Sequence, residues 1–497
     1  MDSIQEVILS MDQVQQKEFV SFIQRNKYRK GRKDLQLFNL LKEEKERKPK
    51  ELVKLLQTSN MNAYHTIRKR LFNHLADFFI LKSTSSEANP TSYINGIIGV
   101  VNYLFDRGLT DQGWKYLKLA ENLATQYHYS DILNSIYLLQ IEKCHLQKEI
   151  HLNDVIINYQ KNHELLKQDE KLKIAMSVVR DRFDQLKQTG VDIDFQNLIV
   201  STLNRLEIDK NVLQTPRVVL LLVKIVRTGI IAKKDFYDFE PYLIKEYNRL
   251  YKNSDEDVNY MVKAEFLYLI AHTCYRNKKF SQSLNYLMEL GSVIDQCSVS
   301  FQNQFKAKTI QLVAANKVFL GELLEAIDDL SKLYKIKSKL SNQENLNTIV
   351  NLGIYKFLNK DYKASLALLN DFTHSDNWYK KVMGVEWVLK RNLMEVLLFI
   401  ELGFDDLVES RIRSIERNYA DLKMHPIYKK AFNYLVLLKD YLNNNQDNPS
   451  KLHEEMLKRL EFVPYEQEDI QAMAFYAWIK SKAIRQNFYP TLLGLIK

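Results

Sequence analysis

The chain has 497 residues, of which 46% are hydrophobic and 27% charged, and its formal net charge is +10. Such a length exceeds what one ordinary hydrophobic core serves, so we expect several domains or an elongated array of repeats. With only 13 glycines and 8 prolines, the composition excludes an all-β chain, which needs turn residues roughly every ten positions. Long segments without either residue predict an all-α fold.

The cysteines and the apolar runs bear on where the protein resides. Cys144, Cys274 and Cys297 are odd in number, widely spaced and without a CxxC motif, which encodes neither a disulfide framework nor a zinc knuckle. The N-terminal residues include acids where a signal peptide needs basic residues. The densest apolar run, Val218–Val226, is interrupted by Lys224 and is too short to span a membrane. We therefore expect a cytoplasmic protein that does not associate with membranes.

Residues 1–82 are predicted to form a small, basic, helical N-terminal bundle. They contain 17 Lys and Arg residues against 10 Asp and Glu residues, a net charge of +7, whereas the rest of the chain contains 54 against 51. A local excess of positive charge attracts anionic partners, and salt weakens the attraction. Hydrophobic periodicity, with Pro49 in a first turn, predicts helices over 3–26, 34–46, 49–57 and 62–82.

The stretch RNKYRKGRKD, from Arg25 to Asp34, has six basic residues in its first nine positions. We expect a loop here, because Gly31 marks a turn and Asp34 can cap the helix that follows. The loop is either simply solvated or contacts an anion, with Tyr28 available to stack on a nucleobase. The candidate anion or nucleic-acid contacts are Arg25, Lys27, Tyr28, Arg29, Lys30, Arg32 and Lys33, together with Lys69 and Arg70 further along.

Residues 50–79, KELVKLLQTSNMNAYHTIRKRLFNHLADFF, allow a helix-turn-helix interpretation, with a short helix, a turn and a longer helix. At 100° per residue, one face of the longer helix is apolar, with Tyr64, Ile67, Leu71, Leu75 and Phe78. The opposite face is polar, with Thr66, Lys69, Arg70, Asn73 and Asp77. The alternative is a plain capping bundle, because any small helical bundle has such faces, Asp77 repels DNA, and the turn lacks a glycine.

From residue 92 onward, helix-period segments alternate with short breaks, and the clearest self-similarity lies between 260 and 420. Three segments align: FLYLIAHTCYRNKKFSQSLNYLMEL from Phe266, IQLVAANKVFLGELLEAIDDLSKL from Ile310, and IVNLGIYKFLNKDYKASLALLNDF from Ile349. Each contains an apolar helix, a polar turn and a second apolar helix. The turns end at Phe280, Leu323 and Tyr362. Small residues follow at Ser283, Ala326 and Ser365, and others precede them by twelve positions at Ala271, Ala314 and Gly353. A weaker fourth copy has Phe404 and Leu407, with Glu395 where a small residue is expected.

Small side chains at matched positions let two antiparallel helices approach closely beside their turn. This pattern resembles the tetratricopeptide repeat (TPR), in which a small residue on the first helix meets a small residue on the second. The resemblance implies a right-handed α-solenoid whose first helices line a concave groove. The chain departs from the family in its repeat spacing of 43, 39 and 42 residues rather than 34, and in lacking the family's Trp and Pro.

The predicted domains are the N-terminal unit, an α-solenoid over 92–442 and C-terminal capping helices over 451–497. Residues 100–124 repeat the hairpin pattern, with Gly108 at the turn and Gly113 at the small position. Residues 132–147 and 154–168 indicate another hairpin, and further helices follow over 171–250. Whether the repeats run unbroken through 130–250 is left open by the sequence.

No catalytic signature stands in a structural context that supports it. The chain lacks HExxH, GxSxG and GxxxxGK[ST] motifs, and His145 and His151 fall on opposite sides of a helix, so they do not share a metal site. We therefore expect no enzymatic activity, no cofactor and no metal.

Two functions fit these features. The first is a scaffold that binds a protein or peptide partner in its concave groove, and the candidate groove residues are Tyr268, Lys317, Tyr355 and Lys356. Trp378 and Trp387 belong either to the core or to the groove. The alternative is a nucleic-acid-binding regulator that uses its basic N-terminal unit, with the solenoid as a sensor or dimerisation module. The sequence names neither the partner nor the oligomeric state.

Overall fold

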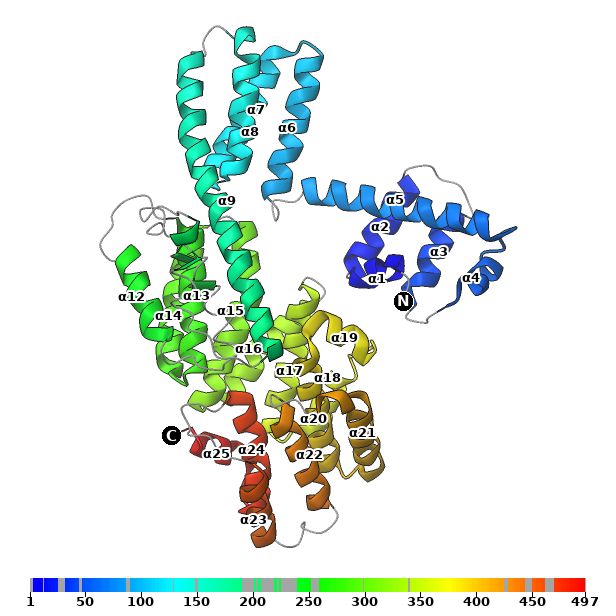
Figure 1. The fold of residues 1–497 in the computed structure, drawn as a ribbon. Coiled ribbons are helices and arrows are strands. Elements are labelled where there is room, and N and C mark those ends of the chain that lie inside the picture. The colour runs from blue at the N-terminus through cyan, green and yellow to red at the C-terminus, as the bar shows by residue number, and fades with distance from the viewer. Residues whose placement is uncertain are drawn as a thin grey trace. The chain divides into compact units, whose positions relative to one another are not determined.

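The computed structural model in Figure 1 describes residues 3–11, 13–25, 32–43, 47–85, 90–127, 129–147, 151–189, 201–202, 204–206, 219–220, 223–224, 239–251, 259–297, 299–337, 340–423, 428–442, 449–460 and 469–496. Every regular element in these ranges is a helix and none is a strand, so the predicted all-α fold is confirmed. Within the same ranges, we find no helix whose length and apolar character would let it cross a membrane.

The chain forms two compact units, residues 1–226 and 227–497. The helices of the first unit are α1 (Ser3–Ser10), α2 (Gln13–Arg25), α3 (Lys33–Lys42), α4 (Pro49–Leu55), α5 (Met61–Ser85), α6 (Pro90–Asp106), α7 (Thr110–Gln126), α8 (Ser130–Lys143) and α9 (Leu152–Thr189). Those of the second are α12 (Phe239–Tyr251), α13 (Tyr260–Arg276), α14 (Phe280–Ile294), α15 (Val299–Leu320), α16 (Leu323–Lys335), α17 (Asn342–Leu358), α18 (Tyr362–Leu369), α19 (Asp376–Met383), α20 (Val385–Leu402), α21 (Asp405–Asn418), α22 (Lys429–Asp440), α23 (Pro449–Arg459), α24 (Ile470–Ala483) and α25 (Phe488–Gly494).

This division differs from the predicted domains 1–82, 92–442 and 451–497. The boundary falls inside the predicted repeat array. The C-terminal segment also shares two hydrophobic cores with the hairpins that precede it, instead of standing apart from them. Hydrophobic contacts between segments distant in sequence therefore define the second unit.

Helices α1 to α5 enclose one hydrophobic core. Within it Phe19 packs on Phe38 and Phe78, with ring centroids 4.9 and 5.4 Å apart. The predicted apolar face of α5 is buried, with Tyr64 1% and Leu71 0% exposed, and the predicted polar face is exposed. The amphipathic character predicted for α5 is thus confirmed.

The prediction of a single helix over 3–26 is wrong, because α1 and α2 replace it. The chain bends at Met11, and the side-chain amide of Gln16 donates to the carbonyl oxygens of Ile8 (3.3 Å) and Met11 (3.1 Å). Helix ends leave carbonyls without helical partners. A glutamine of α2 therefore helps to satisfy the end of α1, which hydrophobic periodicity does not reveal.

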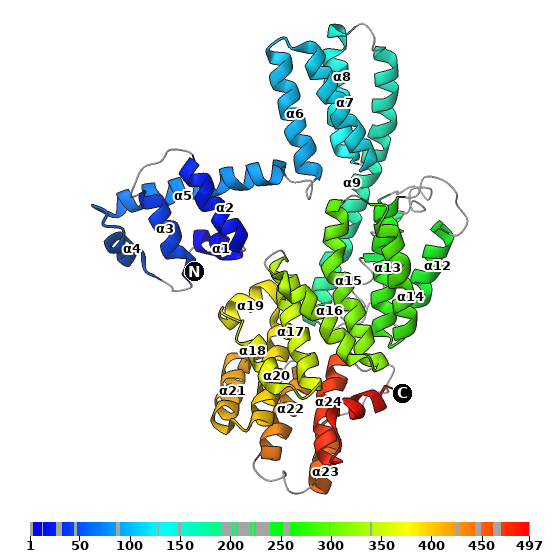
Figure 2. The ribbon, with the colours of Figure 1, turned by 180° about the vertical axis from the view of Figure 1, so that it is seen from behind.

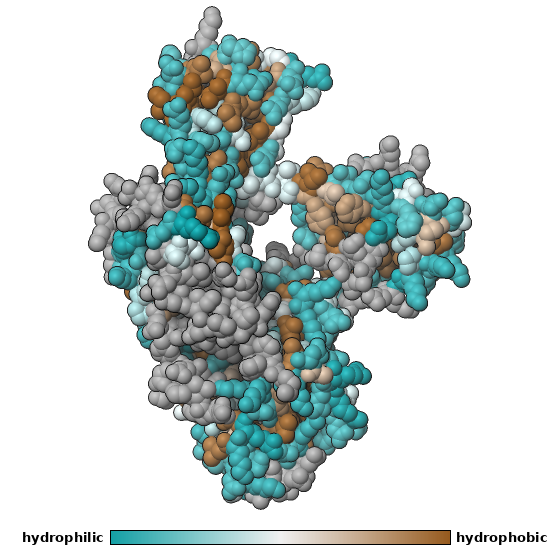
Figure 3. Space-filling model, viewed as in Figure 1, coloured by the Kyte–Doolittle hydropathy of each residue, from teal (hydrophilic) through white to brown (hydrophobic). Residues whose placement is uncertain are grey.

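Helices α6 to α8 enclose a second core in the first unit, around Val101, Leu117 and Ile136. The predicted helix at 154–168 and the residues that follow form one helix, α9, which the Asn162 amide ties to the Ser130 carbonyl (2.8 Å). Apolar side chains are also exposed over α6 to α8, where Figure 3 shows brown areas in the hydrophilic surface. Most of residues 190–238 lie outside the described residues, so whether the repeats run unbroken through 130–250 stays open.

In the second unit, helical hairpins follow one another in chain order (Figures 1 and 2). Each of the turns α13/α14, α15/α16, α17/α18 and α20/α21 contains a residue with left-handed backbone: Lys278, Gly321, Lys360 and Gly403, with φ of 62°, 95°, 65° and 70°. The next N–H donates to the carbonyl five positions earlier, as from Lys279 to Cys274 (2.9 Å). This Schellman motif satisfies carbonyls at the end of the first helix. The second helix then starts two residues after the left-handed one.

A turn of the same kind joins α6 to α7, at Gly108 (φ 72°), where the Leu109 N–H donates to the Leu104 carbonyl (2.9 Å).

The left-handed turn at Gly403 fixes the register of the hairpin α20/α21. Counting from Gly403, the positions equivalent to Ala271 and Ser283 are Val396 and Val408, both 0% exposed. The predicted register, with Glu395 and Leu407, is therefore wrong by one residue.

The structure places all six predicted small residues inside the hairpins. Ala271, Ser283, Ala314, Ala326, Gly353 and Ser365 are all buried. Two of the pairs are also hydrogen-bonded, because Ser283 Oγ donates to the Ala271 carbonyl (2.7 Å) and Ser365 Oγ to the Gly353 carbonyl (2.8 Å). A side-chain hydroxyl that reaches the backbone of the facing helix requires the two helices to be close.

Gly353 offers a test of this close packing. A Cβ added at Gly353 lies 3.7 Å from Leu369 Cδ2 and 3.8 Å from Ser365 Oγ, so alanine fits but a larger side chain does not. We expect Gly353→Leu to lower the free energy of unfolding by about 1–3 kcal/mol. Gly353→Ala should be neutral or stabilising by up to about 1 kcal/mol, since alanine favours helix. The measurement is urea unfolding of the full chain followed by tryptophan fluorescence.

The matched control is Gly291, in α14, where an added Cβ meets nothing within 4 Å. Gly291→Leu should not destabilise the protein. Equal destabilisation by the two leucine substitutions would contradict the close approach at Gly353.

Candidate binding cavity

A cavity of about 620 Å³ lies in the second unit, and we call it the central cavity. Its walls come from the first helices of the hairpins, α13, α15, α17 and α20, and from the C-terminal helices α24 and α25. Each first helix turns one face to its own second helix and another face to the cavity. The apolar part of the lining includes Phe319, Ile354, Met394, Ile470, Phe475 and Phe488.

Neutral polar groups interrupt this apolar lining. Tyr275 of α13 and Tyr355 of α17 both line the cavity, and burial raises the pKa of both phenols. Their hydroxyls have no hydrogen-bond partner in the described part of the chain. Asn347 and Asn351 lie one helical turn apart on α17, and the oxygen of Asn347 accepts from Trp387 Nε1 (3.1 Å). The cavity therefore offers uncharged hydrogen-bonding groups beside aromatic rings.

Several charged side chains of the lining are held in ion pairs. Asp469 is only 3% exposed; it bonds Arg276 Nη2 at 2.5 Å, lies 3.7 Å from Lys390 Nζ and accepts the Ala472 N–H at the start of α24 (3.2 Å). Lys390 also pairs with Glu386 (2.7 Å). Because a single carboxylate faces two cations and caps a helix, it fixes the position of α24 against α13 and α20.

A second cation of α20, Arg391, is 4% exposed and is held from several sides. Its guanidinium bonds the Asp376 carboxylate (2.6 Å) and the Asn392 amide oxygen (2.7 Å). The guanidinium carbon also lies 5.2 and 5.0 Å from the ring centroids of Phe372 and Tyr379. These contacts hold the Arg391 side chain in the wall of the cavity, and the Asp376 carboxylate neutralises its charge.

The C-terminal helices lie along the first helices of the hairpins. Trp478 Nε1 donates to Glu401 (2.8 Å), and Tyr489 Oη donates to the Val318 carbonyl (2.6 Å). Ala477 and Leu492 are buried in the core formed with α15 to α18. The segment 451–497 therefore contributes a wall of the central cavity, in addition to any capping role.

The predicted groove residues fall in two places. Tyr268 and Tyr355 line the central cavity, but Lys317 and Lys356 do not. Lys317 pairs with Asp329 (2.8 Å) and Glu325 of α16, and Lys356 pairs with Asp361 at its own turn (3.4 Å). Both lysines stand next to the turn, on the side that faces the second helix of the hairpin.

The two tryptophans also differ in position, because Trp387 lines the cavity whereas Trp378 stacks on His374 with centroids 4.1 Å apart. Sequence reasoning missed Tyr275, Asn347 and Asn351. The spacing of Asn347 and Asn351 is a usable signal, since residues three or four positions apart share a helix face.

The basic N-terminal stretch is only partly described, and Lys27, Tyr28, Arg29 and Lys30 lie outside the described residues. Arg32 is held internally: its guanidinium bonds the Asp34 carboxylate (2.7 and 3.1 Å) and the Ile23 carbonyl (2.9 Å) and lies 3.0 Å from His74 Nε2. Lys33 Nζ donates to the Gln57 carbonyl (2.8 Å). The remaining candidates, Arg25, Lys69 and Arg70, are exposed.

The predicted helix cap at Asp34 is wrong. Helix α3 begins at Lys33, without a side-chain cap, and Asp34 is its second residue and 1% exposed. Burial acts to raise the pKa of Asp34, but the hydrogen bond and charge of Arg32 outweigh it and hold that pKa below its usual value. This carboxylate therefore stabilises the fold above its unfolded-state pKa, and the contribution is lost as the pH falls through the folded-state pKa.

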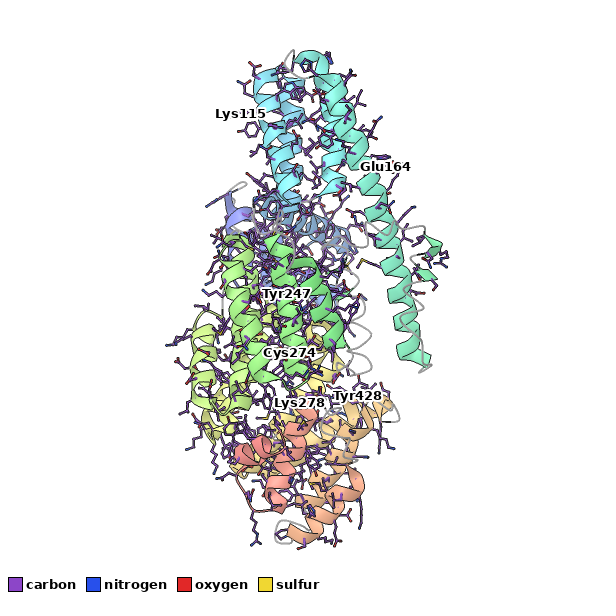
Figure 4. All side chains as sticks on the ribbon, turned by 90° about the vertical axis from the view of Figure 1, so that its left-hand side faces the viewer. Lys115, Glu164, Tyr247, Cys274, Lys278 and Tyr428 are labelled. Carbon is purple, nitrogen blue, oxygen red and sulfur yellow. The ribbon has the colours of Figure 1, made fainter. Side chains whose placement is uncertain are left out.

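A buried polar cluster joins α12 to the hairpin α13/α14, close to Cys274 and Lys278, which Figure 4 labels. The Glu240 carboxylate accepts from Asn277 Nδ2 (2.7 Å) and Lys279 Nζ (2.7 Å). Burial raises the pKa of Cys274 to about 12, so its thiol is protonated near neutral pH and is not a nucleophile. Across the described residues, no three His, Cys, Asp or Glu side chains gather closely enough to hold a metal ion.

The role of Asp469 in fixing the cavity wall can be tested by substitution. Asp469→Asn keeps a capping oxygen for α24 but removes the charge of the carboxylate that faces Arg276 and Lys390, so we expect it to lower the free energy of unfolding by about 1.5–3 kcal/mol. Glu386→Gln is the control, because Glu386 is 46% exposed and its ion pair contributes no more than about 1 kcal/mol. Urea unfolding of both variants measures the difference, and equal effects would contradict the role given to Asp469.

Comparison with known proteins adds no assignment to this geometry. No protein family model matches the chain, and no curated protein is similar to it in sequence. The function has to be argued from the residues themselves.

Proposed function

We propose that this protein is a non-enzymatic scaffold whose hairpins form a right-handed, TPR-like α-solenoid, and that it binds a protein or peptide partner along the first helices. One observation carries the proposal: successive first helices, α13, α15, α17 and α20, each turn one face to a common cavity. Stacked helical hairpins make extended concave surfaces of this kind. The recurring left-handed turn supports the regular stacking that a solenoid requires.

The side chains on this surface suit recognition. Tyr268 and Trp387 combine large apolar area with a polar atom, as side chains at the centres of protein interfaces do. Asn347 and Asn351 offer amides that can bond the backbone of an extended peptide. Binding here needs no reactive group, and the buried, protonated Cys274 supplies none. The free cysteines support a cytoplasmic location as part of the proposal.

The C-terminal helices define which part of the surface a partner can reach. Because α24 already covers part of the first helices through Ile470, Ala474 and Phe475, the partner has to bind beside it. Tyr268 on α13 and Trp387 on α20 then mark two walls of the accessible surface. The way α24 packs also indicates that this surface accepts an apolar helix face.

A photo-crosslinking experiment tests the proposal. With benzoylphenylalanine in place of Tyr268, in the central cavity, we expect one specific partner to be crosslinked in cells. The same group at Leu324, 69% exposed on α16, should give no such product. The identified partner should bind the purified chain, and Trp387→Ala should weaken that binding by about tenfold or more, as for an interface hot spot. Equal crosslinking at both positions, or full affinity of the Trp387 variant, would overturn the proposal.

A second candidate function is nucleic-acid binding by the N-terminal unit. It is favoured by the net charge of +7 over residues 1–82 and by the exposed Arg25, Lys69 and Arg70. Cations on an exposed helix face can contact phosphates. Arg32 and Lys33 are less suited to this role, because both are bound to other parts of the N-terminal unit. In this alternative the second unit is a sensor or dimerisation module.

A salt series tests the second candidate. We expect the full chain to shift duplex DNA at about 50 mM salt. Substitution of Arg25, Lys69 and Arg70 by Gln should lower the slope of log K against log salt concentration by about 0.9 for each phosphate that the variant no longer neutralises. Arg32 stays unchanged, since its substitution would leave Asp34 buried without its partner. Lys363→Gln, an exposed lysine of the second unit, is the control. Absence of a shift at this salt concentration would remove the candidate.

A further inference from the structure

We propose that the central cavity is a binding site for a small, uncharged, aromatic molecule that carries a hydrogen-bonding oxygen. This inference goes beyond the scaffold function, because it assigns a class of small ligand to the central cavity, and it does not require that a protein partner binds there. It rests on the volume of the cavity, on hydroxyl groups in its wall that can donate to a ligand, and on the pairing of most of its charges.

The volume and lining of the cavity suit a small molecule. At about 620 Å³, the central cavity lies within the range of roughly 300–1,000 Å³ typical of ligand pockets. Such pockets are mostly apolar and contain a few placed polar groups, and this one combines Phe319, Met394 and Phe475 with Tyr275, Tyr355 and Asn351. Aromatic rings on several walls favour a flat aromatic body, through stacked or edge-to-face contacts.

The hydroxyls of Tyr275 and Tyr355 are the polar groups that can bond a ligand in this cavity. Tyr355 is 7% exposed, and among the described residues neither its hydroxyl nor that of Tyr275 has a hydrogen-bond partner. Both side chains line the cavity, and neither hydroxyl oxygen is a fully buried atom, so each can donate to a group that enters. The Asn351 amide on the same lining adds donors and an acceptor. A ligand oxygen can accept a hydrogen bond from these hydroxyls.

Three of the four Lys and Arg residues of the lining are paired with carboxylates, which favours an uncharged ligand. Arg276 is paired with Asp469, Lys390 with Asp469 and Glu386, and Arg391 with Asp376. The remaining lysine of the lining, Lys308, lies over the Phe305 ring, with Nζ 3.3 Å from the ring centroid. An anionic ligand would have to displace a buried carboxylate from its cation, and a cationic ligand would have to displace a cation from its carboxylate. Either exchange leaves a buried charge without its partner, which is costly. A neutral molecule enters without disturbing these pairs.

Two fluorescent probes test the site in the full-length protein. Prodan is a neutral naphthalene whose ketone oxygen accepts hydrogen bonds, and 8-anilinonaphthalene-1-sulfonate has a similar aromatic body with a negative charge. We expect prodan to bind saturably at one site per chain with blue-shifted emission, and the sulfonate to bind that site at least tenfold more weakly. Non-saturable prodan binding, or equal affinity of the two probes at this site, would overturn the proposal.

Substitutions locate the binding. Ala315→Trp fills the cavity from α15, where Ala315 is 9% exposed, and should abolish saturable prodan binding. Leu324→Trp places the same ring on the outer surface of α16 and should leave binding unchanged. Circular dichroism shows whether both variants are folded. Prodan binding that persists in a folded Ala315→Trp variant would refute the site.

Tyr355→Phe decides the matter even where Ala315→Trp does not fold. It removes one hydroxyl and no volume, so prodan affinity should fall about fivefold, as for the removal of one neutral hydrogen bond. The melting temperature of the free protein should not fall, because the hydroxyl has no partner there to lose. Unchanged prodan affinity would show that the hydroxyl does not bind the ligand, and a lower melting temperature without probe would show that it stabilises the fold; either result would overturn the proposal.

Discussion

The second unit depends on the close approach of two helix backbones beside a left-handed turn. Ser365 Oγ reaches the Gly353 carbonyl, and Ser283 Oγ reaches the Ala271 carbonyl, across the pairs α17/α18 and α13/α14. Only small side chains permit such contacts, and the turn residue sets which positions face each other. Because this constraint fixes one face of each first helix inside its hairpin, it also decides which face is left for the central cavity. The proposed scaffold function and the proposed small-molecule site both use this remaining face.

Much of this constraint is readable in the sequence, because small residues at a fixed spacing from a turn form a local pattern. The pattern is less clear where glycine is absent from the turn: Lys278 and Lys360 adopt φ of 62° and 65°, which costs a non-glycine residue about 1 kcal/mol or more. The hairpin α20/α21 has a glycine, Gly403, yet its predicted register is wrong by one residue, because Val396 and Val408 replace small residues. Aligning the left-handed residues and not the aromatic ones corrects it.

The cavity was less predictable, because its walls come from segments far apart in the chain. Tyr268 follows from helix periodicity, but the contact of Arg276 with Asp469 joins residues 193 positions apart. No local pattern indicates that α24 packs along the first helices. Lys317 illustrates the opposite error: as a polar residue on a first helix it suits a groove, but its reach to Asp329 and Glu325 turns it toward α16. Next to the hairpin turn, Lys317 is close enough to the acids of the second helix to pair with them, and it does not extend into the groove.

The same reasoning limits what the net positive charge of residues 1–82 says about partners. A net charge is a sum over residues, whereas a partner meets only the charges that the fold leaves accessible. Arg32 counts as one of the positive charges in the stretch from Arg25, yet Asp34, 1% exposed, holds it through two hydrogen bonds. In the central cavity Asp469 acts likewise on Arg276. In both units a buried aspartate binds an arginine, so that this arginine stabilises the fold and is less available to a partner. The phenols of Tyr275 and Tyr355 are therefore better indicators of a ligand than the arginines around them, since their bonding capacity is the part that the fold leaves unused.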